Sequence, residues 1–136
     1  MKQNFVERCV FSHRNIYMYY SRRDGDQYNG PILSFLEGRM TEGDYQSVLI
    51  KKIKKRFPNV VVIKNDPTYI QGFPDLLLLR GNKWAALEVK KDRYAHHQPN
   101  QDYYINRCKD MGSYSSFIFP ENEKEVLDEL ERAFKS

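Results

Sequence analysis

The segment GFPDLLLLRGNKWAALEVK, residues 72–90, contains two apolar runs of strand length on either side of a Gly-Asn pair. Short apolar runs bounded by turn residues are typical of β-strands, and Gly-Asn is a turn signal. The sequence therefore predicts a β-hairpin with its turn at Gly81 and Asn82.

Alternation along the two strands places charged side chains together at one end of this hairpin. Successive side chains of a strand point to opposite faces, so Asp75 shares a face with Leu77, and Glu88 shares a face with Lys90. Neighbouring carboxylates repel each other unless a cation lies between them, and Mg²⁺ prefers carboxylate oxygen. The pattern predicts a metal site at Asp75 and Glu88, with Lys90 placed to stabilise negative charge or orient a water.

The spacing of these residues resembles the signature of the PD-(D/E)XK nuclease superfamily, because Pro74-Asp75 precedes Glu88-Val89-Lys90 by a spacer of twelve residues. The wider context is similar to the VRR-NUC branch, whose members also resemble small Holliday-junction resolvases. That branch has a helix that opens with Glu and carries Gln one turn later, a Gly before Pro-Asp, and a Gln at the head of the next helix. The matching residues, within roughly residues 41–120, are Glu42, Gln46, Gly72 and Gln101.

The resemblance implies an α/β fold with a restriction-endonuclease-like core, in which helices flank a central mixed four-stranded sheet. It implies a Mg²⁺-dependent deoxyribonuclease, with Mn²⁺ as a substitute cofactor. The metal ligands would be Asp75, Glu88, the Val89 carbonyl and Glu42, the last directly or through water. Lys90 and Gln101 would complete the catalytic set, with Gln101 reaching a metal-bound water or Lys90.

Residues 41–57 are expected to form an amphipathic helix, with Thr41 as its cap and Pro58 at its end. Taken alone, Glu42 would be an exposed first-turn residue that complements the helix dipole. Cations crowd the other end of this helix. They complement the dipole there, and they also predict sequence-independent phosphate contacts by Lys51, Lys52, Lys54 and Lys55.

The remaining elements complete the predicted sheet. Residues 60–63 should form its first strand, residues 99–111 a helix, residues 113–119 a fourth strand and residues 120–134 a closing helix. The fourth strand offers Tyr114, Phe117 and Phe119 as candidate core residues.

The basic stretch after Lys90 is expected to contact nucleic acid through Lys91, Arg93 and His97. Zinc binding by His96 and His97 is disfavoured, because no further Cys or His is suitably spaced.

Residues 1–40 are predicted to be an aromatic and basic extension of the nuclease core at residues 41–136. Two strands around a turn at residues 24–26 and a short helix near residues 32–37 are expected. This hairpin would pack on the core, complete a homodimer or contact DNA. We expect a homodimer whose interface uses part of residues 11–20.

Composition agrees with one globular domain: 136 residues, 40% hydrophobic, 29% charged and a net charge of +4. Cys9 and Cys108 are far apart without metal-ligand spacing, which is typical of reduced thiols. No apolar run is long enough for a membrane span, and no secretory signal is evident. The expected location is cytoplasmic, including the host cytoplasm if a phage or mobile element encodes the chain.

These patterns predict a structure-selective endonuclease that cuts branched DNA, such as Holliday junctions, in recombination, repair or replication. A two-fold symmetric homodimer would match a branched junction. Alternatives are a nicking, restriction-type or exonuclease activity, a nucleic-acid-binding protein that no longer cuts, and an assembly module whose carboxylates pair with lysines. The intact Asp75, Glu88 and Lys90 argue against loss of cleavage.

Overall fold

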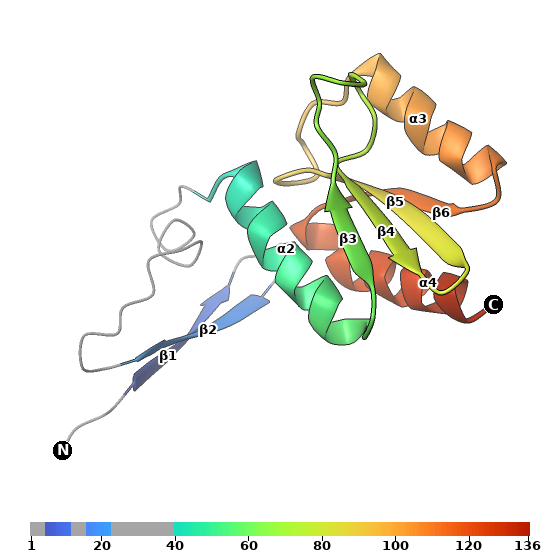
Figure 1. The fold of residues 1–136 in the computed structure, drawn as a ribbon. Helices are drawn as coiled ribbons and strands as arrows, with labels where there is room; N and C mark the ends of the chain where they lie inside the picture. Colours follow the sequence, from blue (N-terminus) through green and yellow to red (C-terminus); the bar gives the residue numbers. More distant parts are fainter. Residues whose placement is uncertain (1–4, 12–15, 23–39) are drawn as a thin grey trace.

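The structure is a computed structural model that describes residues 5–11, 16–22 and 40–136. In these segments, strands β1 (Phe5–Phe11) and β2 (Ile16–Arg22) form a two-stranded antiparallel sheet. The strands β3 (Val61–Lys64), β4 (Leu76–Arg80), β5 (Lys83–Val89) and β6 (Tyr114–Ile118) form a four-stranded sheet in that order (Figure 1). The β3–β4 and β4–β5 pairs are antiparallel and the β5–β6 pair is parallel, so the sheet is mixed.

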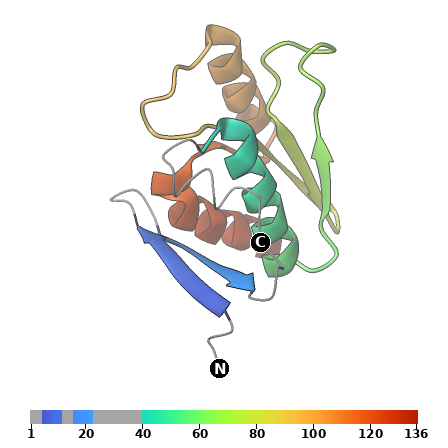
Figure 2. The same cartoon turned by 90° about the vertical axis from the view of Figure 1, so that its left-hand side faces the viewer.

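Helices flank this sheet. Helices α2 (Glu42–Arg56) and α4 (Glu123–Lys135) share an apolar cluster with the sheet, and the short 3-10 helix η1 (Pro120–Asn122) leads into α4. Helix α3 (Pro99–Asp110) connects the parallel strands β5 and β6 and contacts both (Figures 1 and 2). The predicted α/β arrangement, a mixed four-stranded sheet flanked by helices, is confirmed.

The core lies on the sheet face that meets α2 and α4. Alternate residues of the central hairpin, Leu76, Leu78, Ala85, Leu87 and Val89, are completely buried there. Each large apolar side chain buried in this way contributes roughly 1.5–3 kcal/mol. The helices supply the other side of the cluster through Tyr45, Leu49, Ile53, Val126 and Leu130.

The local signals of the central hairpin and of α2 are borne out. Arg80 pairs with Lys83 across a turn in which Gly81 has a φ of +63°, a conformation that suits glycine. Thr41 caps α2 through a reciprocal pair of hydrogen bonds with Asp44. The sequence therefore predicts correctly the hairpin and the helix that carry the three carboxylates of the expected site.

The core residues of β6 are only partly the predicted ones, because Tyr114 packs against the core cluster but Ile118 takes the central position. Parallel pairing sets Ile118 beside Val89 on the face that meets α2 and α4, and it sets Phe117 beside Glu88 on the opposite face. Ile118 is completely buried, whereas Phe117 and Phe119 are only partly buried. Apolar residues on both sides of this strand hide which face points inward, and a shift of one residue exchanges the faces.

The N-terminal hairpin is present, but its turn was predicted in the wrong place. Phe5 pairs with Arg22 and Phe11 with Ile16, so the connection is residues 12–15 and not residues 24–26. Two β-forming runs of seven residues decide the pairing, and they outweigh the Asp-Gly-Asp turn signal. The helix predicted near residues 32–37 and the side chains of the proposed dimer interface lie outside the described residues. The boundary near residue 40 stays a prediction.

Helices α2 and α4 are joined by a buried polar contact. Glu123, the first residue of α4, accepts a hydrogen bond from the Tyr45 hydroxyl at 2.9 Å on one oxygen. Its other oxygen accepts one from the Lys52 ammonium at 2.7 Å. Further along, Arg56 donates to Asp128 and Glu131. We call the group Tyr45, Lys52 and Glu123 the α2–α4 contact.

Within residues 5–11, 16–22 and 40–136, no helix is both long and apolar enough to cross a bilayer.

Candidate active site

Asp75 and Glu88 face each other across the central hairpin. The β4–β5 ladder ends at the Leu76–Leu87 pair, so the next residue on each strand lies directly opposite the other. Side chains in such positions have Cβ atoms roughly 5 Å apart. Asp75 Oδ2 also accepts a hydrogen bond from the Val89 backbone N–H at 2.9 Å. The hairpin register alone therefore brings the two carboxyl groups together.

Asn65 holds the backbone at the start of β4. Its backbone N–H donates to the Asp75 carbonyl at 2.8 Å, which continues the β3–β4 pairing one residue beyond β4. Its side-chain amide donates to the Pro74 carbonyl at 2.6 Å. The position of the Asp75 carboxylate thus depends on a residue that the sequence analysis did not select.

Lys90 and Gln101 complete a polar bridge on the same face. The Lys90 ammonium lies 3.9 Å from Glu88 Oε2 and donates to Gln101 Oε1 at 2.9 Å. The Gln101 amide nitrogen donates to Glu88 Oε2 at 2.9 Å. The backbone N–H of Gln98 also donates to Gln101 Oε1 at 2.9 Å. Because two donors share this atom, it is the amide oxygen, and the nitrogen must face Glu88.

The first turn of α3 is held against the loop that precedes Asp75. Asn100 donates a hydrogen bond from its side chain to the Gln71 carbonyl at 3.0 Å. Gly72 has a φ of +88°, and a Cβ atom there would lie 2.4 Å from Asn100 Cγ. Only glycine permits this approach without strain. Gly72 is therefore required at this position for a structural reason, because it allows the first turn of α3 to approach closely and to place Gln101 next to Glu88.

Glu42, the first residue of α2, contributes a third carboxylate at the edge of the cluster. It accepts a hydrogen bond from the Lys91 backbone N–H. Partial desolvation of its carboxyl group raises its pKa; the nearby charge of Lys90 lowers the pKa and that of Asp75 raises it. The structure thus places Glu42 within electrostatic reach of the hairpin.

Glu88 is the most perturbed group of the site. Its pKa is raised to about 9. Burial is the largest cause, and the Asp75 charge and a hydrogen bond between the two carboxyl groups raise the pKa further, whereas the Lys90 charge lowers it. Glu88 Oε1 is buried and accepts no hydrogen bond from a protein donor in the described residues. A proton shared with Asp75, a buried water or a cation would satisfy this oxygen.

The donor atoms fit a hard divalent cation. The Val89 N–H points at Asp75, and in a strand the carbonyl of the same residue points to the same side. Within the described segments, no three His, Cys, Asp or Glu side chains are arranged to hold a metal ion. Mg²⁺ commonly uses one or two carboxylates and keeps several waters. Asp75, Glu88 and the Val89 carbonyl offer oxygen atoms of this kind, and Glu42 lies at the edge of the same cluster.

The basic loop after β5 begins beside this cluster. Lys91 follows Lys90 directly, and its side chain is exposed. Arg93 lies 3.8 Å from Glu121 in an ion pair, so part of its charge is already balanced. His97 stacks on Phe117 with ring centroids 3.9 Å apart. Of the three predicted nucleic-acid contacts in this loop, Lys91 is the closest in sequence to the site.

The structure does not bring the lysines of α2 to the site. They lie 9 to 13 residues after Glu42, which corresponds to roughly 14–20 Å along the helix axis (Figure 1). Lys52 is engaged in the α2–α4 contact. Lys51, Lys54 and Lys55 are exposed, so a phosphate contact by these three stays a prediction for a distant part of a bound substrate.

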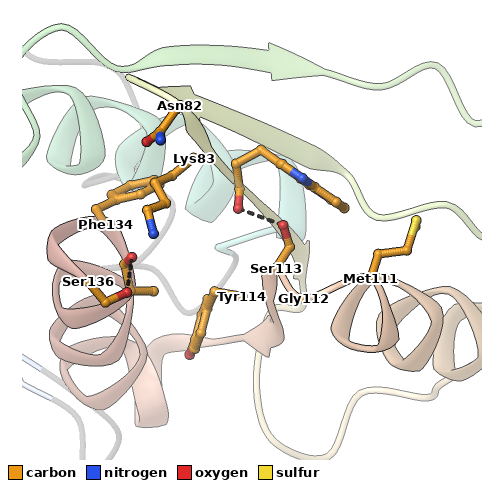
Figure 3. A pocket seen from close by; sticks show the side chains of 10 residues that line it. Asn82, Lys83, Met111, Gly112, Ser113, Tyr114, Phe134 and Ser136 are labelled. Carbon is orange, nitrogen blue, oxygen red and sulfur yellow. Dashed lines mark hydrogen bonds between the residues drawn. The ribbon is translucent and has the colours of Figure 1, made fainter.

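A pocket of about 180 Å³ lies at the opposite end of the hairpin (Figure 3). Its walls come from the β4–β5 turn, the end of α3, the start of β6 and the end of α4. Figure 3 shows the Ser113 hydroxyl donating to the Trp84 carbonyl within it, at 2.9 Å. None of the predicted site residues lines this pocket, so the pocket and the polar cluster are separate features.

No protein-family model matches the chain, and no curated protein sequence matches it. The class of protein therefore rests on the fold and the site. The chain is a mixed α/β protein with acidic residues, a lysine and a glutamine clustered at one end of its central hairpin.

Proposed function

We propose that the protein is a Mg²⁺-dependent endonuclease that hydrolyses DNA phosphodiester bonds on a restriction-endonuclease-like fold. The observation that carries the proposal is the buried Oε1 of Glu88, which accepts no hydrogen bond from an N–H or O–H donor of the described protein and lies directly opposite Asp75. A protein that used these carboxylates only for stability would pair each oxygen with a donor, as it does at Glu123.

The residues of the site have distinct roles in this reaction. Asp75, Glu88 and the Val89 carbonyl would hold the cation, which when bound lowers the pKa of water and polarises the scissile phosphate. The Lys90 ammonium supplies positive charge next to the carboxylates, where it orients the attacking water or offsets charge on the phosphate in the transition state. Gln101 keeps Lys90 and Glu88 at fixed positions through its amide.

We further propose that the substrate is branched DNA and that the active form is a homodimer. Cleavage of a branched structure requires cuts in two strands, and a two-fold symmetric pair would present one site to each strand. Mn²⁺ is expected to replace Mg²⁺, because it also accepts carboxylate and carbonyl oxygen ligands.

The test is a panel of labelled junction, flap, duplex and single-stranded DNAs incubated with Mg²⁺, Mn²⁺ or EDTA. Cleavage should require the metal and should disappear in Asp75→Asn. The matched control is Asp110→Asn, which removes an exposed carboxylate at the far end of α3. Titration calorimetry should detect Mg²⁺ binding in the control but not in Asp75→Asn. Equal cleavage by the two variants would refute the assignment.

A further inference from the structure

Two tyrosines on the loops that border the site are almost completely exposed. Tyr69 is 85% exposed, in the loop that leads from β3 to Asp75. Tyr94 is 81% exposed, in the loop that leads from Lys90 to α3. Figure 2 shows these loops on opposite sides of α3, and in sequence one loop leads into β4 while the other leaves β5.

Neither ring has a role in the packing of residues 40–136. In that range, neither ring stacks on another aromatic ring and neither hydroxyl forms a hydrogen bond. Other tyrosines are engaged: Tyr45 donates to Glu123, Tyr114 donates to Glu129, and Tyr104 packs edge-on against Phe73. An aromatic ring left in water forgoes the stabilisation that burial would give it.

The backbone of each tyrosine is nevertheless held in place by an aspartate turn. The Tyr69 N–H donates to the Asp66 carbonyl at 3.1 Å, and the Asp66 side chain accepts from Thr68. The Tyr94 N–H donates to the Asp92 side chain at 2.8 Å. Fixed loops that present a free ring lower the conformational entropy lost when the ring binds a partner.

The charges around the two rings favour a nucleic acid as that partner. The first loop follows the exposed Lys64, and the second contains the exposed Lys91 and Arg93. Cations that meet phosphates next to aromatic rings that stack on bases are the usual composition of a single-strand binding surface. The bases of an intact duplex are stacked on each other, so a loop-borne ring reaches a base face only where the strands are unpaired.

We propose that Tyr69 and Tyr94 stack on unpaired bases on the two sides of the scissile phosphate. The inference rests on the proposed nuclease function and names its substrate more closely. The strand bound at the site is single-stranded or splayed at the cut. The rings set where cleavage occurs, while the carboxylates carry out the chemistry.

The test measures binding in EDTA, so that it does not depend on cleavage. Single-stranded DNA containing 2-aminopurine, whose fluorescence falls on stacking, is titrated with the full chain. Tyr69→Leu and Tyr94→Leu should each weaken binding about tenfold and reduce the quenching. The matched controls Tyr69→Phe and Tyr94→Phe keep the ring and should behave as the unaltered protein. Blunt duplex of the same sequence should bind all variants equally.

The outcomes test the stacking of the two tyrosines separately from the proposed nuclease function. Leu variants that bind and quench like the unaltered protein would overturn it, and so would an equal loss on single-stranded and duplex DNA. If the stacking signal is present but no DNA is cut with Mg²⁺, the proposed function fails and the stacking site stands. Thermal melting of each variant should be unchanged, since both side chains are exposed.

Discussion

Glu88 and Glu123 are both almost fully buried, at 3% and 6% exposure, but their carboxylates have different surroundings. Each oxygen of Glu123 accepts a hydrogen bond, from Tyr45 and from Lys52. One oxygen of Glu88 accepts from Gln101, while the other has no donor among the residues that the structure describes and lies beside a second carboxyl group. The α2–α4 contact is electrostatically complete, and the strand-end site is not.

The difference shows why burial alone does not identify a functional carboxylate. A buried charge with all its partners holds two elements in place. A buried charge that lacks a partner lowers stability, so it persists where something other than stability requires it. Parallel substitutions of Glu88 and Glu123 test this difference.

The largest expected effect is on cleavage. Glu88→Gln should lower the rate by roughly a thousandfold or more, because it removes a carboxylate that we propose to be a metal ligand. Binding of DNA should be retained or tightened, since one negative charge near the phosphate is lost. Glu123→Gln, the matched substitution at the α2–α4 contact, should leave the cleavage rate within a few fold. Single-turnover cleavage of the best DNA substrate measures both, and equal losses would show that the two sites do not differ in function.

The second effect is on stability, where substitution of Glu123 should cost more than substitution of Glu88. Glu123→Ala should lower the free energy of unfolding by about 2 kcal/mol, because it leaves the Tyr45 hydroxyl and the Lys52 ammonium without their acceptor, and Lys52 is partly solvated. Glu88→Gln should maintain or raise stability in EDTA, because the neutral amide needs no proton to lie beside Asp75. Urea denaturation of the two variants provides the comparison. Destabilisation of Glu88→Gln beyond that of Glu123→Ala would contradict it.

The third effect concerns pH. The pKa of Glu88 is raised from its usual value to about 9 in the folded protein, so the folded state binds more protons than the unfolded state between roughly pH 4.5 and pH 9. The contribution of this extra proton to the free energy of unfolding is fully present below the pKa of Glu88 in the unfolded protein. It is lost as the pH rises through the pKa of Glu88 in the folded protein. The metal-free protein should therefore become less stable from pH 5 to pH 9. Melting temperatures in EDTA should show this fall, and Glu88→Gln should flatten it.

The smallest effect separates the lysines of α2. Reversing the charge of Lys54 and Lys55 should weaken DNA binding for all sequences and reduce its salt dependence, with little change in stability. Lys52→Glu should lower stability instead, because Lys52 belongs to the α2–α4 contact. Binding measured at several salt concentrations, together with urea denaturation, distinguishes the two cases. An unchanged salt slope for Lys54 and Lys55 would mark that end of α2 as a solvated surface only.

Sequence reasoning succeeds where the structure depends on nearby residues. The turn at Gly81 and Asn82 fixes the hairpin register, and that register places Asp75 opposite Glu88. Thr41 and the apolar stripe after it define α2. The position of Gln101 next to Lys90 was expected only from the family resemblance, because no local signal brings the start of α3 to the strand end.

The features that sequence reasoning missed depend on contacts between distant segments. Asn65 and Asn100 look like ordinary loop and helix residues until the loop before Asp75 is folded against β3 and α3. The partners of Glu123 come from another helix, 71 and 78 residues away. The N-terminal turn was misplaced because strand pairing there outweighs the turn residues.

The register that opposes Asp75 to Glu88 also has a consequence for the rate of folding. A hairpin with a two-residue turn closes on a microsecond timescale, whereas Gln101 reaches Glu88 only through the packing of α3 on the sheet, which joins segments more distant in sequence. The carboxyl groups of Asp75 and Glu88 therefore come together before Gln101 forms its hydrogen bonds to Glu88 and Lys90. We expect refolding in EDTA to be slower at pH 8 than at pH 6, and Mg²⁺ or Glu88→Gln to remove the difference in stopped-flow experiments. An ion that serves the chemistry would then also accelerate the assembly of its own binding site.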